Sequence, residues 1–337
     1  MFRRMFHQPT SQPQDGGELL SRLLEHNEES GPIRSPLVLI SQISRSGGTW
    51  LSQLFDHHPQ VWAHPLELRF GQSRKSDWPE LASGNDAQDA WVTLRYAKAE
   101  EAFGSGTYSK GNVDTHPMLF EVDVQHALFL RFAEIYKPTT DREWFDLYFT
   151  SFFNAWLDYQ RRYGLKKYLA GFASMLALEP QSMMRFRQVY PDGWLISILR
   201  EPLGWYASVK QRAKMDEKAK RSAKKRLYGG FEEVEAAYLD NIKAFHANRT
   251  LFRDRFIELD YEALAADTEA TVKALAKRIG LDWHPTLTRQ TFNGMSIRPN
   301  TSFASGDDKS RKSVLSEEDV TRISDGPMMA AYRTSRP

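Results

Sequence analysis

The chain contains one short run whose residue types could bind a phosphate group: Arg45-Ser46-Gly47-Gly48-Thr49-Trp50. Its two glycines allow a tight turn that brings backbone N–H groups close to an anion. Arg45 adds a positive charge and Ser46 a hydroxyl, while Thr49 can cap the N-terminus of a helix that follows. We therefore expect these residues to form a phosphate-binding loop.

A second set of residues has the same chemistry. Trp194 to Leu199 is an apolar run that predicts a buried strand, and Arg200 follows it directly. The next helix carries Ser208 eight residues later, and then Arg212. A guanidinium at the carboxyl end of a strand and a hydroxyl two turns along the next helix can both contact one phosphate.

The elements around the first loop favour an α/β fold. Leu37 to Ile40 form a continuous apolar run, which is typical of a strand buried on both faces. Leu51, Leu54 and Phe55 then recur at helical spacing. The order strand, loop, helix places the loop at the carboxyl end of a strand, where α/β sheets bind their ligands.

The loop is not a Walker A loop, since no Lys follows the second glycine, and the dinucleotide pattern Gly-x-Gly-x-x-Gly is absent. It resembles the 5′-phosphosulfate loop of the sulfotransferases, usually written Lys/Arg-Ser-Gly-Thr-Thr-Leu/Trp. Gly48 departs from that pattern, because it replaces the first Thr and removes one hydroxyl. A glycine-rich turn that binds no ligand remains the alternative at this point.

Two further segments resemble the same family. Arg200 with Ser208 matches the Arg-x-Pro-…-Ser signature that contacts the 3′-phosphate. The stretch from Phe256 to Trp283 is similar to the family's Tyr-Glu-x-Leu, helix, Gly-Leu segment, in which the Tyr, here Tyr261, lies against the adenine site. Family members also cover the nucleotide with a loop near residues 296–312, where Ser302 is a candidate contact.

An acidic residue past the loop is the expected catalytic base. Glu67 lies at the offset used by sulfotransferases of the glycan and tyrosyl-protein type, after His58, Pro59 and Val61, in what reads as a loop behind a short strand over 61–63. His64 is the rival, because cytosolic small-molecule sulfotransferases use a His base, although theirs lies much further along the chain.

The resemblance implies one sulfotransferase domain over residues 36–325, after an N-terminal tail and short helix in 1–35. Its fold would be α/β, with a mostly parallel central sheet flanked by helices. The donor would be 3′-phosphoadenosine 5′-phosphosulfate (PAPS), without a metal, with Arg45 and Glu67 catalytic. The predicted donor contacts are Arg45, Ser46, Gly47, Gly48, Thr49, Trp50, Arg200, Ser208, Arg212, Tyr261 and Ser302. The alternative is a P-loop-type kinase or a nucleotide-binding protein that transfers no sulfuryl group.

Residues 70–165 are expected to form a helical, aromatic-rich insertion on the acceptor side. Trp144, Tyr148, Phe152 and Trp156 recur every four residues, a spacing that predicts one packed helix face. The basic run from Lys210 to Arg226 predicts a solvated helix face or, alternatively, a guide for an anionic glycan or lipid head group.

Composition restricts the class of protein further. The 337 residues contain no cysteine, which excludes disulfides and thiolate metal sites. A formal charge of +2 gives no support for nucleic-acid binding. No apolar run approaches the roughly 18 residues of a membrane span, so we expect a cytoplasmic protein. The oligomeric state is not predicted.

Overall fold

The computed structural model describes residues 31–70, 77–81, 86–96, 103–110, 113–215, 229–298 and 314–336, with residues 17, 18, 21, 22 and 25. In these ranges the main sheet has five strands in the order β2-β5-β1-β6-β7, and all neighbours are parallel. The strands are β1 Leu37–Ile40, β2 Val61–Glu67, β5 Tyr168–Phe172, β6 Trp194–Leu199 and β7 Phe256–Asp260. The predicted α/β class is confirmed.

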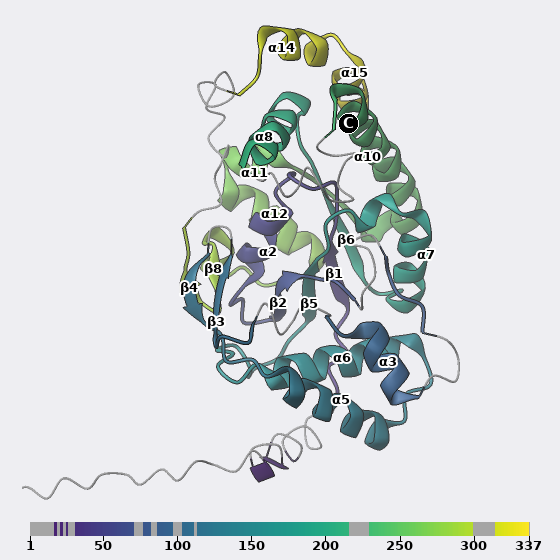
Figure 1. The fold of residues 1–337 in the computed structure, drawn as a ribbon, viewed down its shortest axis with the longest axis vertical. Coiled ribbons are helices and arrows are strands. Elements are labelled where there is room, and N and C mark those ends of the chain that lie inside the picture. Colours follow the sequence, from purple (N-terminus) through teal and green to yellow (C-terminus); the bar gives the residue numbers. More distant parts are fainter. Residues whose placement is uncertain are drawn as a thin grey trace, which may run out of the picture.

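Helices cover both faces of this sheet (Figure 1). Val38 and Ile40 of β1 pack with α2 (Gly48–Phe55) and α12 (Thr268–Ile279). Leu37 and Leu39 point to the opposite face and pack with α7 (Pro180–Val189) and α10 (Phe231–Phe252). Because β1 is buried on both faces, its continuous apolar run predicted it correctly.

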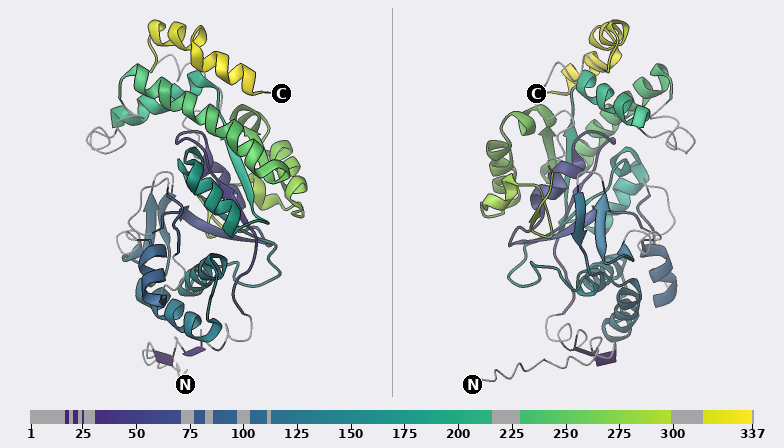
Figure 2. Two further views of the ribbon diagram at one scale, coloured as in Figure 1. Left: turned by 90° about the vertical axis from the view of Figure 1, so that its right-hand side faces the viewer. Right: turned by 60° about the vertical axis from the view of Figure 1, so that its left-hand side comes forward.

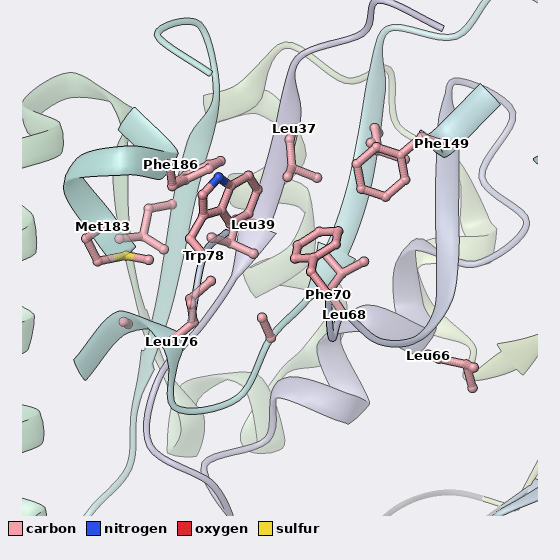
Figure 3. Close-up of a cluster of buried hydrophobic side chains, with 14 of the residues drawn as sticks. Leu37, Leu39, Leu66, Leu68, Phe70, Trp78, Phe149, Leu176, Met183 and Phe186 are labelled. Atoms are coloured by element: carbon pink, nitrogen blue, oxygen red, sulfur yellow. The ribbon is translucent and has the colours of Figure 1, made fainter. Parts of the chain in front are cut away.

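The larger of the two cores joins the second face of the sheet to the aromatic helices (Figure 3). Trp78 lies at its centre, fully buried, with its ring 4.8 Å from Phe145 and 5.1 Å from Phe186. Burial of each such side chain stabilises the fold by about 1.5–3 kcal/mol. The insertion and the sheet therefore share one core.

The described residues between β2 and β5 include the helices α3 (Ala87–Leu94), α5 (Val122–Tyr136) and α6 (Asp141–Ala155). The aromatic residues at four-residue spacing on α6 are all buried, which confirms their packing role. The insertion is helical and rich in aromatic residues, as predicted, and it also contains an antiparallel hairpin of β3 (Thr107–Lys110) and β4 (Val113–Pro117), which was not predicted. Thr107, Tyr108 and Val113 are β-branched or aromatic, residue types that favour strands.

A second hairpin, β8 (Thr291–Phe292) and β9 (Met295–Ser296), lies beside the first one (Figure 1). The rings of Tyr108 and Phe292 stack at 4.6 Å between them. The buried carboxylate of Asp56, at the C-terminus of α2, accepts hydrogen bonds from Thr291 Oγ1 at 2.6 Å and from the Gly294 N–H at 2.9 Å. This hairpin is thereby attached to the helix that follows the predicted loop.

The C-terminal helices lie at the far end of the molecule, where α15 packs along α10 (Figure 2). The remaining elements are α8 (Pro202–Met215), α11 (Tyr261–Ala266), α14 (Glu317–Ser324), α15 (Pro327–Ser335) and the short helices η1 (Leu176–Leu178), η3 (Arg253–Arg255) and η4 (Pro285–Thr288). None of the helices described here is long and apolar enough to cross a membrane.

Candidate active site

The loop between β1 and α2 has the tight geometry that its glycines predict. Arg45 and Gly47 both have left-handed backbone conformations, with φ values of 75° and 95°. Gly47 is the N-cap of α2, and no side chain caps this helix end. The prediction that Thr49 caps the helix is wrong, because α2 begins at Gly48 and Thr49 is already its second residue. The N–H groups of the first turn therefore remain available to an anion.

The two predicted anion-binding sets meet at this loop. Arg45 Nε donates a hydrogen bond to Ser208 Oγ at 3.1 Å, across from α8. Arg200 Nη1 donates a hydrogen bond to the carbonyl oxygen of Arg45 at 2.9 Å, and this bond stabilises the left-handed turn at Arg45. Trp205 Nε1 binds the carbonyl oxygen of Ser44 at 3.0 Å. The loop after β1 is thus fixed by the elements that follow β6.

Tyr261, at the start of α11, forms the wall beneath the turn. The Arg200 guanidinium lies 3.9 Å from the centre of its ring, a cation–π contact. The ring of Trp50 meets it edge-on at 5.9 Å. A Cβ on Gly47 would lie 2.8 Å from the Tyr261 ring, so a side chain at position 47 has neither the space nor the backbone conformation it needs.

These groups line one open pocket that encloses about 480 Å³, its mouth included. From the predicted set, the lining residues are Arg45, Gly47, Gly48, Thr49, Trp50, Arg200, Ser208 and Tyr261. Two more lining residues, Gln42 and Phe172, were missed by the sequence analysis. Both lie at the carboxyl end of a strand, β1 or β5, and that position is the signal that could have found them.

Among the described residues, two predicted donor contacts do not line the pocket. Ser46 is 1% exposed and lies behind the loop, and its Oγ has no hydrogen-bond partner among the described residues. Arg212 is exposed further along α8. Ser302 lies outside the described residues, as do residues 216–226 of the basic run.

Glu67 is the last residue of β2, and not part of a loop as the sequence suggested. Ala63 pairs with Ala170 and Glu67 with Phe172, so β2 bulges between them at Pro65, which has no N–H to donate. The Glu67 carboxylate accepts a hydrogen bond from Ser174 Oγ and forms a 3.0 Å ion pair with Arg69. It lies at the same edge of the sheet as the loop and is not part of the pocket lining.

His64, the alternative base, is buried on the side of β2 opposite to Glu67. Its ring lies 4.4 Å from the ring of Phe152, and Nδ1 is 2.9 Å from the carbonyl oxygen of Leu66. Burial lowers the pKa of His64 to about 4. The imidazole is therefore neutral near pH 7, enclosed by aromatic side chains and a weak proton acceptor.

The parallel sheet with an anion-binding turn at its carboxyl edge defines a nucleotide-binding α/β protein of the P-loop-like type. A family model described as the sulfotransferase family matches residues 36–285. The match covers most of the chain, so the chain belongs to the sulfotransferase family and is a sulfotransferase enzyme. This family takes its sulfuryl group from PAPS.

Several solved sulfotransferase structures are similar to this chain. A sulfotransferase domain from the curacin biosynthetic pathway is 12% identical, with a TM-score of 0.51, and the alignment covers 88% of this chain and 98% of that one. A sulfotransferase from Alicyclobacillus acidocaldarius is 14% identical (TM-score 0.43, 89% and 99% covered). Mouse sulfotransferase SULT7A1 complexed with PAP is 10% identical (TM-score 0.40, 94% and 94% covered). A search of curated proteins found no match.

Proposed function

We propose that this enzyme transfers the sulfuryl group of PAPS to a hydroxyl of a carbohydrate or glycolipid, with Glu67 as general base. The observation that carries this proposal is the single pocket in which Arg45, Arg200 and Ser208 surround the Gly47 turn. Residues from three separate parts of the sequence converge there. Each of them supplies a hydrogen-bond donor suited to an anion.

The pocket residues fit a nucleotide that carries phosphate at two positions. The N-terminus of α2 offers backbone N–H groups, and Ser46 has a buried hydroxyl without a partner among the described residues. Buried polar groups are rarely left unpaired, so an unpaired hydroxyl directly behind the turn is a feature of a ligand site. Arg200 and Ser208 supply donors on the other side of the turn.

In this proposal PAPS supplies the sulfuryl group, on a 5′-phosphate that then departs. Arg45 and the N–H groups of α2 stabilise the negative charge that develops at the departing oxygen. Glu67 accepts the proton of the acceptor hydroxyl as that oxygen bonds to sulfur. Ser174 and Arg69 hold the Glu67 carboxylate in place, since each contacts one of its two oxygens.

The acceptor class is proposed from the position of the base. An early Glu is similar to the base of the glycan type, and this argument is an analogy with the family. The described part of the basic run gives the proposed acceptor class little support, because Lys210 is already paired with Asp319 at 2.7 Å. Arg212 is exposed on the same helix.

Two measurements test the proposal. Thermal unfolding with 3′-phosphoadenosine 5′-phosphate (PAP) and with AMP tests the donor site. At a hundredfold excess over its Kd a ligand stabilises by about 2.7 kcal/mol. We expect PAP to raise the melting temperature by several degrees and AMP to have little effect. Equal shifts would contradict a dedicated 3′-phosphate site.

Transfer of radiolabelled sulfate from PAPS to a panel of oligosaccharides, glycolipids, phenols and tyrosyl peptides tests the acceptor. Label in a saccharide fraction is the expected result. Label only in phenols or peptides would overturn the acceptor class while leaving the donor assignment intact. PAP binding without transfer to any acceptor would favour a nucleotide-binding protein that has lost the reaction.

A further inference from the structure

Gly48 is the residue at which this loop departs from the sulfotransferase pattern, which has Thr there. Gly48 is the first residue of α2 and has no left-handed backbone conformation, so its geometry permits any side chain. The space does not. A Cβ at Gly48 would lie 2.2 Å from Gln42 Nε2 and 2.2 Å from Phe172 Cε2.

The carboxamide of Gln42 therefore occupies the place that a side chain at position 48 would take. Gln42 follows β1 by two residues, is 2% exposed and lines the pocket beside Arg45 and Thr49. Its backbone carbonyl is fixed by the N–H of Met175 at 2.9 Å, which anchors the residue from outside the loop. The ring of Phe172 closes the other side.

The side chain of Gln42 is also unsatisfied. Its Oε1 is buried without a hydrogen-bond partner among the described residues. An unpaired buried oxygen destabilises the folded protein, and as an acceptor it cannot itself bind an anion. The group that can do so is the donor Nε2 of the same carboxamide, which lies where a side chain at position 48 would be. Here the amide faces a cavity already lined by Arg45 and Arg200.

From these observations we infer that Gln42 is an anion-binding residue that replaces the loop hydroxyl absent at Gly48. Its Nε2 donates a hydrogen bond to the 5′ end of PAPS, the phosphate that carries the sulfuryl group. Phe172 holds the carboxamide against the turn. Gln42 and Gly48 thus form a matched pair, in which the glycine leaves room for the amide. This inference depends on the proposed PAPS site.

The test uses Gln42→Leu, which keeps the approximate volume and removes the donor. Calorimetry with PAP and with adenosine 3′-monophosphate, which lacks the 5′-phosphate, separates the two ends of the ligand. We expect the Kd for PAP to rise about tenfold, as loss of a hydrogen bond to a charged group implies. Binding of adenosine 3′-monophosphate should not change.

Thermal unfolding without ligand is a second measurement, because the expected change in stability is opposite to the expected loss of PAP affinity. Because Gln42→Leu removes a buried polar group without a partner, the variant should unfold at the same temperature as the wild type or higher in the absence of ligand. A variant with normal folding and weaker PAP binding would exclude general damage to the pocket. Gln42→Glu, which places a carboxylate next to the anion, should weaken PAP binding more than Gln42→Leu does.

Gln125→Leu is the matched control. Gln125 is also buried, with an unpartnered Nε2 among the described residues, and lies on α5 away from the pocket. It should leave both Kd values unchanged. If Gln42→Leu weakened the binding of both ligands equally, Gln42 would have a structural role only, and the inference would be wrong. Unchanged PAP binding would also overturn the inference and would leave the proposed function standing. A wild-type protein that does not bind PAP would overturn the proposed function as well.

Discussion

Arg45 Nε donates a hydrogen bond to Ser208 Oγ at 3.1 Å, although the two residues are 163 positions apart in the sequence. The family resemblance implies different ends of the donor for the two residues, the 5′-phosphate for Arg45 and the 3′-phosphate for Ser208. Their contact shows that the two predicted anion positions share a group. Arg200 strengthens this connection through its bond to the Arg45 carbonyl.

The first prediction concerns this coupling. Arg45→Ala and Ser208→Ala should each weaken PAP binding, and the double variant should lose less than the sum of the two. Directly contacting residues typically show interaction energies of about 0.5–3 kcal/mol. Calorimetry on all four proteins completes the cycle. Additive losses within about 0.3–0.5 kcal/mol would mean that the contact has no role in donor binding.

The second prediction separates binding from turnover. Arg200→Ala removes a charge-assisted contact worth about 1.5–3 kcal/mol, so the donor Kd should rise tenfold or more. Arg45→Ala should lower kcat more than it raises the donor KM, because its charge stabilises the departing phosphate. Steady-state kinetics with PAPS give kcat and the donor KM of both variants and so test both expectations. An Arg45→Ala enzyme with an altered KM and an unchanged kcat would contradict this role.

The third prediction concerns Glu67. Glu67→Gln keeps the shape and removes the basic oxygen, so kcat should fall at least about a hundredfold, within the 10²–10⁴ range of general-base catalysis. Its PAP affinity should match that of the wild type. Glu258→Gln is the control, since Glu258 also lies on a strand of the same sheet and is paired with an arginine, Arg249. Comparable losses in both variants would argue against Glu67 as the base.

The fourth prediction uses the buried imidazole of His64. Its folded pKa is about 4 and its unfolded value about 6.5, so below pH 6.5 the unfolded chain binds a proton that the folded protein excludes. Stability therefore falls as the pH drops through this window. His64→Asn should reduce the loss between pH 7 and pH 5 by about 2 kcal/mol, measured by urea unfolding.

The same variant also tests the rival base. Since His64 is enclosed by aromatic rings, His64→Asn should change kcat less than tenfold while it lowers stability near pH 7 by roughly 1–3 kcal/mol. A loss of kcat larger than that of Glu67→Gln would reverse the assignment of the two residues.

The fifth prediction concerns the attachment of the β8–β9 hairpin. Burial raises the pKa of Asp56, and its carboxylate still accepts two hydrogen bonds from the hairpin. Asp56→Ala leaves the Thr291 hydroxyl and the Gly294 N–H without this acceptor, at a cost of about 1–3 kcal/mol each. Denaturant unfolding should show the loss. Asp254→Ala, at an exposed position, should change stability by less than about 0.5 kcal/mol.

Local patterns predicted the central strands well, because β1 and β6 are buried on both faces and show as apolar runs. The end of β2 was misjudged, since Pro65 normally interrupts a strand and here creates a bulge that continues to Glu67. The β3–β4 hairpin was missed among helices, where its short strands are easily overlooked.

The pocket was only partly predictable for a physical reason. Arg45, Arg200 and Ser208 belong to motifs with fixed spacing, whereas Gln42 and Phe172 belong to none. Their importance arises from the space around Gly48, which depends on how β5 lies next to β1. No motif records this relationship between neighbouring strands, and the only local signal for Gln42 and Phe172 is their position at the carboxyl end of a strand.

The strand order has a consequence for how enzymes of this kind diversify. Most of the pocket residues follow β1 and β6, two inner strands of the sheet, whereas Glu67 ends the edge strand β2. The aromatic helices and the first hairpin all lie between β2 and β5 in the sequence. Substitutions at the exposed positions of that stretch do not touch the core that it shares with β1. If the acceptor binds on this side, as the sequence predicts, such substitutions change which molecule is sulfated and leave the residues after β1 and β6 as they are.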